Sequence, residues 1–403
     1  MPEIAIIGGG AGGMMAALTA AENAANRVSL FERQARVGRK LLSTGNGRCN
    51  LTNLNCSPAY YHSETPGFAA HALEAFPVPE TLKWFREHGL VTVAEDSGRV
   101  YPLSNSTNSV LDVLRLSIEQ SENITVFTGA PVLELRRAPK GFTVKTENGS
   151  VAFDKVIVAC GGMAGAKLGG VKDGYTLLQS LGHSRTSLHP ALVQLTTDTD
   201  YPKRLKGVRA DAKLSLSAPR QTRMRTEGEV QFTEKGVSGP AVFDLSRAVS
   251  VSDEKLTLTL DFLRDYSIQD VYAMLTARRN HLPSLPAEEL LTGVLHNRLG
   301  RTILYYVNLD TKKPMADLSD AELKEAARAC KGFSLPVRGT EGFDSAQVTA
   351  GGIRCSEFDP MTMESRLVPG LYACGEVLDV DGDCGGFNLQ WAWASGHLAG
   401  RLL

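Results

Sequence analysis

The residues best suited to chemistry lie near the start of the chain, in a glycine-rich loop. Gly8, Gly10 and Gly13 fit the pattern G-x-G-x-x-G between an apolar run and a helical pattern. In such loops the first glycine permits a tight turn, the second lets the backbone approach a pyrophosphate, and the third allows close helix–strand contact. Ala11 and Gly12 lie where the loop gives way to the helix, whose free N–H groups and positive dipole end attract phosphates. The loop therefore predicts a dinucleotide site.

An acidic residue lies where a dinucleotide site uses one. Glu32 follows Gly13 by 19 residues, at the end of a predicted strand over 27–33. A carboxylate there can accept hydrogen bonds from ribose hydroxyls. Arg33 is the next residue, and we assign it to the same end of the cofactor. The strand, the helix and Glu32 together favour cofactor binding over glycines that serve only tight packing.

A second glycine-rich strand end, near the C-terminus, favours FAD over NAD as the bound dinucleotide. Residues 370–396 contain a strand, then Gly375-Glu376, a loop, Gly385-Gly386 and a helix, and the chain has no second G-x-G-x-x-G. A helix N-terminus near the pyrimidine end of a flavin stabilises negative charge on the reduced ring. A terminal docking helix would explain the helix but not the loop. The predicted contacts here are Gly375, Glu376, Gly386, Asn388, Leu389 and Gln390.

These residues need an α/β scaffold to position them. Residues 3–7, 12–23 and 27–33 have the patterns of a strand, a helix and a second strand, which form a βαβ unit. Alternating apolar and polar residues over 124–153 predict a strand followed by a small antiparallel meander. Residues 155–162 return to the pattern of a buried parallel strand. Because the region after 345 becomes glycine-rich again and ends in a helix, we expect the two chain ends to form one α/β domain.

The 403 residues provide enough chain for more than one structural unit. We expect a discontinuous FAD-binding domain formed by residues 1–187 and 341–403, and an inserted substrate or cap domain formed by residues 188–340. The insertion is expected to be rich in strands over 188–262 and helical over 263–340, because alternating patterns give way to helical ones.

Composition excludes several classes of protein. Charged residues make up 22% and the net charge is −1, so no overall field favours nucleic acid or an anionic membrane. The N-terminal run has no Lys or Arg before Arg27 and is interrupted by glycines, which argues against a secretion signal. The sequence contains no apolar run of about 20 residues, so it predicts no membrane span.

The most basic stretch, 203–225, holds eight Lys or Arg, but alternating charges on strands usually form a solvated face. Nucleic-acid binding is therefore the minor alternative.

Cysteine usage argues against a metal site. The seven cysteines include no C-x-x-C pair, so we expect neither a zinc site nor a disulfide framework, and a reducing cytoplasm fits. Cys374 and Cys384 are ten residues apart, and a redox disulfide between them is an alternative to buried packing. The sequence predicts no particular oligomeric state.

Longer motifs resemble a known group of flavoproteins. After strand–GGGAGG–helix come GRKLLSTGNGRCNLTN (38–53), FTEKGVSGPAVFDLSR (232–247), VTAGGI (348–353) and TMESRLVPGLYACGEVLDVDGDCGGFNLQWAWASG (362–396). Over nearly the whole chain they resemble the bacterial Rossmann-type FAD flavoproteins of the aminoacetone oxidase / 3-dehydro-bile-acid delta(4,6)-reductase family. The resemblance implies an α/β fold with a Rossmann-like, glutathione-reductase-type FAD domain and a small antiparallel meander. An inserted β-barrel-like and helical region would interrupt that domain.

The resemblance also implies further cofactor contacts. Val132 would meet the adenine end through its backbone, and Cys160-Gly161 would lie on the pyrophosphate side. Relatives have G-S-T-G-D-G where this chain has GGVKDG at 169–174, so Asp173 is kept and the Ser and Thr hydroxyls are absent. The residues implied along the flavin are Lys40, Ser43, Gly47, Arg48, Cys49 and Asn50.

The resemblance does not fix the substrate. We favour reduction of an activated C=C bond in a hydrophobic, steroid-like or bile-acid-like enone, with NADH or NADPH as transient electron donor and hydride transfer through flavin N5. An oxidase of a small amine such as aminoacetone, which releases hydrogen peroxide, is the alternative, and a flavin-bearing protein that binds nucleic acid or another anion is a third. The catalytic acid is not assigned; Arg48, Tyr101 and His189 are candidates for it, each with a structural role as the alternative. His183 is interpreted as a helix-end residue.

Overall fold

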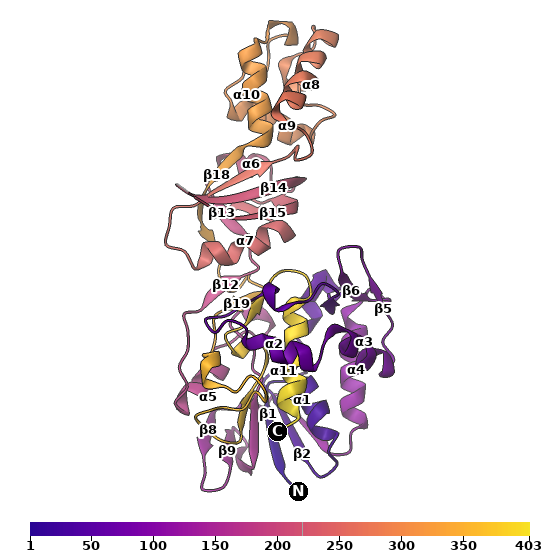
Figure 1. The fold of residues 1–403 in the computed structure, drawn as a ribbon, viewed down its shortest axis with the longest axis vertical. Helices are drawn as coiled ribbons and strands as arrows, with labels where there is room; N and C mark the ends of the chain where they lie inside the picture. The colour runs from indigo at the N-terminus through magenta and orange to yellow at the C-terminus, as the bar shows by residue number, and fades with distance from the viewer. Residues whose placement is uncertain (220) are drawn as a thin grey trace. The chain divides into compact units, whose positions relative to one another are not determined.

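The computed structural model describes residues 1–219 and 221–403, which divide into two compact units. The first unit joins Met1–His189 with Ala346–Leu403, and the second is the continuous segment Pro190–Ser345. Both chain termini therefore belong to the first unit, as Figure 1 shows. The sequence places the inserted domain at residues 188–340. Both of these boundaries differ by a few residues from those of the second unit, Pro190–Ser345.

A five-stranded parallel sheet forms the centre of the first unit. Its order, β20-β11-β1-β2-β7, places a strand from the C-terminal segment beside strands from the N-terminal half. The apolar run at the start of the chain becomes β1, in which four of five residues are buried. The sheet strands are β1 (Glu3–Ile7), β2 (Arg27–Glu32), β7 (Ile124–Thr128), β11 (Lys155–Val158) and β20 (Leu371–Ala373).

The two chain ends are also joined by a close helix pair, α1 (Ala11–Ala21) and α11 (Phe387–Gly400). A Cβ added to Gly396 would lie 2.4 Å from the Gly12 carbonyl oxygen, so only glycine lets the helix backbones approach this closely. Small side chains along α1 are buried in the same way. The N- and C-terminal segments therefore pack against each other within the first unit.

Around this centre lie the predicted meander and several short elements. The three strands β8–β10 form an antiparallel sheet, as the alternating pattern predicts. The remaining strands and α-helices of the first unit are β3 (Thr52–Asn53), β4 (Tyr61–His62), α2 (Phe68–Ala75), α3 (Val78–Glu87), β5 (Thr92–Ala94), β6 (Arg99–Pro102), α4 (Thr107–Gln120), β8 (Glu134–Arg137), β9 (Phe142–Thr146), β10 (Gly149–Phe153), α5 (Asp173–Ser180), β19 (Val348–Ala350) and β21 (Asp381–Gly382). The strand β12 (His189–Ala191) includes the boundary between the two units, which falls after His189.

The second unit contains a closed antiparallel barrel and a group of helices. The barrel order is β13-β16-β15-β14-β17-β18, and its interior is part of a continuous buried apolar cluster. The elements are β13 (Leu195–Thr197), α6 (Asp200–Arg204), β14 (Arg209–Ala218), β15 (Gln221–Phe232), β16 (Gly236–Ser238), α7 (Pro240–Ser250), β17 (Thr257–Asp261), α8 (Ile268–His281), α9 (Asn297–Tyr306), α10 (Asp320–Lys331) and β18 (Phe333–Thr340).

Two elements differ from the expected division of the insertion into strands and helices. The segment expected to be helical, 263–340, ends in the strand β18, which pairs with both β13 and β17 and closes the barrel. Pro336 and Gly339 lie within this strand and obscure its pattern in the sequence. The segment expected to be rich in strands contains the helix α7, which begins with a proline at its first turn.

Candidate cofactor site

The three motif glycines meet very different surroundings. A Cβ on Gly13 would lie 1.8 Å from the Gly8 carbonyl oxygen, and one on Gly8 would lie 2.5 Å from the Ala159 carbonyl oxygen. Apart from its chain neighbours, no atom of the described residues lies within 4 Å of a Cβ added at Gly10. Gly8 and Gly13 therefore serve backbone packing, whereas the side of Gly10 is open to a ligand.

Glu32 organises the loop that would hold the ribose and phosphates. Its carboxylate accepts the Gly9 N–H at 2.9 Å and the Gln34 N–H at 2.7 Å, and the residue is only 9% exposed. An ionised carboxylate has about four acceptor positions, so acceptor capacity remains for ribose hydroxyls. The carboxylate thus lies directly beside the glycine loop.

The residues assigned to the adenine and pyrophosphate ends gather around β2. The backbone of Glu32 accepts the Ala130 N–H at 2.9 Å, which places the segment leading to buried Val132 beside it. Arg33 forms an ion pair with Asp173 of α5, with Nη1 and Oδ2 2.8 Å apart. A Cβ on Gly8 would also lie 2.9 Å from the Cys160 Cα. Residues distant in sequence are therefore brought together at the carboxyl ends of the sheet strands.

The polar segment 44–53 has an unusual backbone. Gly45, Gly47, Asn46 and Cys49 all have positive φ, and for the last two this is a conformation that non-glycine residues seldom adopt. Cys49 is fully buried, and burial raises the pKa of its thiol to about 12, so the group stays protonated. Strained backbone of this kind concentrates at ligand sites.

This segment meets the C-terminal glycine turn. A Cβ on Gly386, whose φ is +99°, would lie 2.5 Å from the Thr52 carbonyl oxygen and 2.8 Å from Asn50 Oδ1. That Asn50 oxygen is buried and has no hydrogen-bond partner among the described residues. The Asn388 side chain accepts the Gly382 N–H at 2.9 Å and donates to the Gly382 carbonyl at 2.7 Å. Leu389 is partly buried against the core.

Gln390 has a structural role that its place in the motif does not reveal. The side chain is fully buried, and Oε1 accepts from the Thr52 hydroxyl at 2.7 Å. Nε2 donates to the Phe76 carbonyl and to the Thr81 hydroxyl, each at 3.0 Å. Both amide hydrogens and the carbonyl oxygen of Gln390 thus form hydrogen bonds within the protein. They link α11 to β3, to the residue after α2 and to α3.

Lys40 and Glu376 form the clearest contact between the two predicted sets of flavin residues. Lys40 Nζ lies 2.7 Å from Glu376 Oε2, and both side chains are half-buried. Glu376 Oε1 also accepts the Thr349 N–H at 2.8 Å. Ser43, assigned to the same set as Lys40, is exposed, and its hydroxyl donates to the Lys40 carbonyl.

The residues present fit an FAD molecule. Like Gly10, the glycines Gly47, Gly161 and Gly375 have no protein atom within 4 Å of an added Cβ, and these three have positive φ. Open space beside such glycines allows a ligand to approach the backbone closely. The buried, unpartnered oxygen of Asn50 provides a polar group that a ligand can satisfy.

Two of the three candidates for the catalytic acid lie in contact. The Arg48 guanidinium carbon is 4.0 Å from the centre of the Tyr101 ring. Arg48 is also held by Glu95 at 2.9 Å and by Asn105. Burial raises the pKa of the Tyr101 hydroxyl, which therefore keeps its proton. The third candidate, His189, is the first residue of β12, on a different strand.

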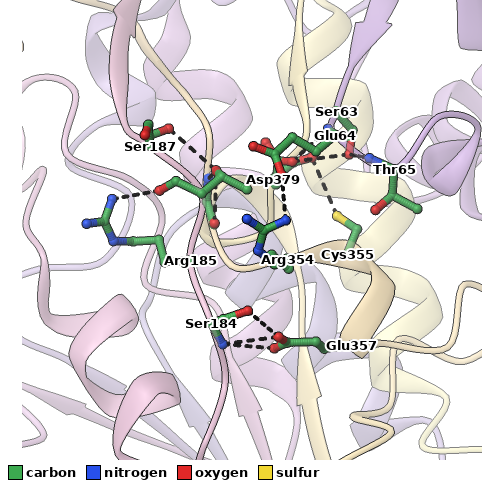
Figure 2. Close-up of polar contacts among 12 residues, drawn as sticks. Ser63, Glu64, Thr65, Ser184, Arg185, Ser187, Arg354, Cys355, Glu357 and Asp379 are labelled. Atoms are coloured by element: carbon green, nitrogen blue, oxygen red, sulfur yellow. Dashed lines mark hydrogen bonds and ion pairs between the residues drawn. The ribbon is translucent and has the colours of Figure 1, made fainter.

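Several polar residues near the C-terminal loop were missed in the sequence. Figure 2 shows buried Asp379, whose carboxylate accepts the Glu64 N–H at 2.8 Å, and Arg354, whose Nη1 lies 2.6 Å from Glu64 Oε2. Further along the loop, Asp383 Oδ1 lies 2.7 Å from His62 Nε2. Aspartates at alternating positions in DVDGD, 379–383, were the available signal, and their partners lie over 300 residues away.

His183 is buried rather than only a helix-end residue. It follows the end of α5, and its Nδ1 and Nε2 lie 2.9 Å from Glu357 Oε2 and from Ser365 Oγ, respectively. Glu357 also binds Ser184, as Figure 2 shows. The Ser365 hydroxyl accepts two backbone N–H groups as well. With no exposed side-chain surface on the histidine, this is a structural network.

The protein should become less stable as the pH falls below about 6.5, the usual pKa of histidine. Burial lowers the pKa of His183 in the folded protein. As the pH falls, the histidine of the unfolded chain therefore binds a proton at a pH where that of the folded chain is still neutral. The free energy of unfolding, measured in urea from pH 8 to 5, should therefore decrease, and less steeply in His183→Gln. His397 contributes in the same direction and leaves a residual slope. Equal slopes in variant and wild type would contradict this assignment.

The basic stretch 203–225 forms a mixed rather than a uniformly positive surface among the described residues. Arg209 pairs with Glu229, and Arg223 binds Glu254 with Nη2 and Oε1 2.6 Å apart. Lys213 lies opposite Glu227 in the β14–β15 register. Such interleaving is typical of a solvated face.

The other thiols and the helices give no sign of a redox disulfide or a membrane span. In the part of the chain that the structure describes, no disulfide joins Cys374 to Cys384, and burial raises the pKa of the Cys374 thiol to about 12, so that thiol stays protonated. Within the described residues no helix is both long and apolar enough to cross a membrane.

Comparisons with known proteins agree with this geometry. The family model described as HI0933-like protein Rossmann domain matches residues 2–402. The 3-dehydro-bile acid delta(4,6)-reductase of Clostridium scindens is 39% identical over 405 residues, which cover 100% of this chain and 98% of the relative. The ribosomal RNA dihydrouridine synthase of Escherichia coli K12 is 30% identical over 398 residues, which cover 97% and 95%.

A solved structure of quinol-fumarate reductase with menaquinol molecules shares the fold. Its TM-score is 0.51 at 16% identity, and the match covers 99% of this chain and 70% of that one. The glycine loop, the parallel sheet, the joined chain ends and a family match along the full length lead to one conclusion. The chain belongs to the HI0933-like Rossmann-domain family and is an FAD-dependent oxidoreductase.

Proposed function

We propose that this protein reduces a C=C bond conjugated to a ketone, in a hydrophobic substrate of the steroid or bile-acid type, with NADH or NADPH as electron donor. The observation that carries the proposal is the 39% identity, over the full length, to a 3-dehydro-bile acid delta(4,6)-reductase. We further propose that the inserted domain selects the substrate, because its barrel and helices lie outside the dinucleotide motif.

Bound FAD would supply hydride transfer at N5. The chain would hold the ribose with Glu32, the pyrophosphate with the N-terminus of α1 beside Gly10, and the flavin with segment 44–50 and the turn at Gly386. The N-cap of α11, Gly386, makes no side-chain cap hydrogen bond, so the first turn of the helix offers backbone N–H groups, and Arg48 offers a positive charge. Both would stabilise negative charge on a reduced ring, and the role of the protein would otherwise be to orient the substrate and exclude water.

Anaerobic reduction tests the proposal. NADH or NADPH should bleach the flavin absorption of the purified protein, and a 3-oxo steroid with a conjugated C=C bond should then restore it with one reduced product per flavin. Comparison of the two nucleotides identifies the donor. Bleaching by aminoacetone alone, with peroxide on admission of air, would instead establish the amine oxidase alternative.

A second candidate function is reduction of uridine in ribosomal RNA, which the 30% identity to a ribosomal RNA dihydrouridine synthase favours. Uracil also contains a C=C bond conjugated to a carbonyl, so the same chemistry would serve both substrates. The paired charges on the β14–β15 hairpin argue against a broad phosphate-binding surface there. Tight binding of ribosomal RNA that weakens steeply with added salt, together with loss of uridine from that RNA, would favour this candidate over the enone.

A further inference from the structure

The pair His62–Asp383 is the partly exposed imidazole–carboxylate contact nearest in sequence to the C-terminal glycine turn. His62 Nε2 lies 2.7 Å from Asp383 Oδ1, and the two side chains are 34% and 25% exposed. His62 is the second residue of β4, which pairs antiparallel with β21, and Asp383 directly follows β21. Strand pairing thus brings together two groups that are 321 positions apart.

This pair is anchored to the candidate flavin site. The Tyr61 hydroxyl donates to the Phe387 carbonyl at 2.9 Å, and the Tyr60 ring stacks on the Phe387 ring at 4.4 Å between centroids. Phe387 is the first residue of α11, directly after Gly386, whose added Cβ would meet the unpartnered Asn50 oxygen. The strand that carries His62 is therefore fixed to the turn where the N- and C-terminal flavin segments meet.

The arrangement of hydrogen bonds suits proton donation. A carboxylate on one imidazole nitrogen fixes the orientation of the ring and stabilises its protonated form. In His62 that nitrogen is Nε2, and among the described residues Nδ1 has no hydrogen-bond partner. His183 offers the contrast, because both of its nitrogens bind protein groups and its side chain is fully buried. His62 is partly open to solvent and can be reprotonated.

We propose that His62, oriented by Asp383, is the proton donor of the reduction, an inference that rests on the proposed function. As a hydride adds to the β-carbon of the enone, the C=C electron pair moves to form an enolate. The α-carbon of the enolate then takes the Nδ1 proton: a C–H bond forms, an N–H bond breaks, and the ring is left neutral until water reprotonates it. NADH or NADPH supplies the two electrons. Asp383 is a positioning residue in this scheme.

Half-reactions separate this role from cofactor binding. In His62→Gln, FAD content and anaerobic bleaching by NADPH should match the wild type. Reoxidation of the bleached protein by the enone should be slower by about 100-fold or more, the usual contribution of a general acid. Asp383→Asn should show a smaller slowing in the same step. His88→Gln, at an exposed histidine after α3, is the matched control and should behave as wild type.

The configuration of the product provides a readout that a structural role would not change. In D₂O the wild type should place deuterium on one face of the α-carbon, whereas His62→Gln should give both epimers, because water then delivers the proton. If the enone reoxidised His62→Gln at the wild-type rate and gave a single epimer, the inference would be overturned. Loss of FAD from that variant would also overturn it. A wild type that NADPH bleaches but no enone reoxidises overturns the proposed function, and the role of His62 with it.

Discussion

Gly10→Val should give a folded protein that binds FAD at least about 100-fold more weakly, equivalent to ~2.8 kcal/mol. The backbone at Gly10 has φ −80° and ψ −172°, which valine adopts without strain. No protein atom lies within 4 Å of an added Cβ, so the apoprotein should keep its stability. The new methyl groups would instead occupy the space that the pyrophosphate needs. Flavin fluorescence titration of the apoprotein and urea unfolding measure the two effects separately.

Gly342→Val is the matched control for this substitution. Gly342 likewise has no protein atom within 4 Å of an added Cβ and no positive φ, but it lies in the second unit. It should bind FAD as the wild type does. Gly13→Val provides the opposite contrast, since its Cβ would meet the Gly8 carbonyl oxygen and the protein should fail to fold. Normal FAD affinity in Gly10→Val would refute the assignment of the glycine loop.

Gln390→Leu should lower the free energy of unfolding by about 3 to 5 kcal/mol, because buried polar groups that lose their partner each cost roughly 1–3 kcal/mol. The leucine would leave the Phe76 carbonyl and the hydroxyls of Thr52 and Thr81 without their present partner in a fully buried position. Chemical unfolding followed by far-UV circular dichroism measures the loss.

The exposed Gln179 on α5 gives the control for this second substitution. Gln179→Leu should change stability by no more than about 0.5 kcal/mol, as is usual for surface positions. If Gln390→Leu were as stable as the wild type, the hydrogen bonds of Gln390 would contribute little to the free energy of unfolding. A variant that kept its stability and lost only FAD would return Gln390 to the cofactor contacts that its sequence motif implied.

Local motifs were readable because their geometry depends on few residues. The loop around Gly10 and the acidic residue Glu32 belong to one βαβ unit, in which a short stretch of chain fixes strand, turn and helix. The alternation over 124–153 predicted the meander for the same reason. The strand β18 was missed because Pro336 and Gly339 interrupt its pattern, and it forms because the barrel needs a sixth strand to close.

The sequence by itself determined the βαβ unit and its dinucleotide loop, since glycine spacing and apolar periodicity act over short distances. The longer motifs at the two chain ends, through their resemblance to FAD flavoproteins, indicated the cofactor and the discontinuous domain. Only the tertiary structure decided which distant side chains meet. Lys40 reaches Glu376 and His62 reaches Asp383 because strand pairing and helix packing bring segments over 300 residues apart into contact. Such contacts follow from the register of β4 on β21 and from the close approach of α1 to α11, which no local pattern encodes.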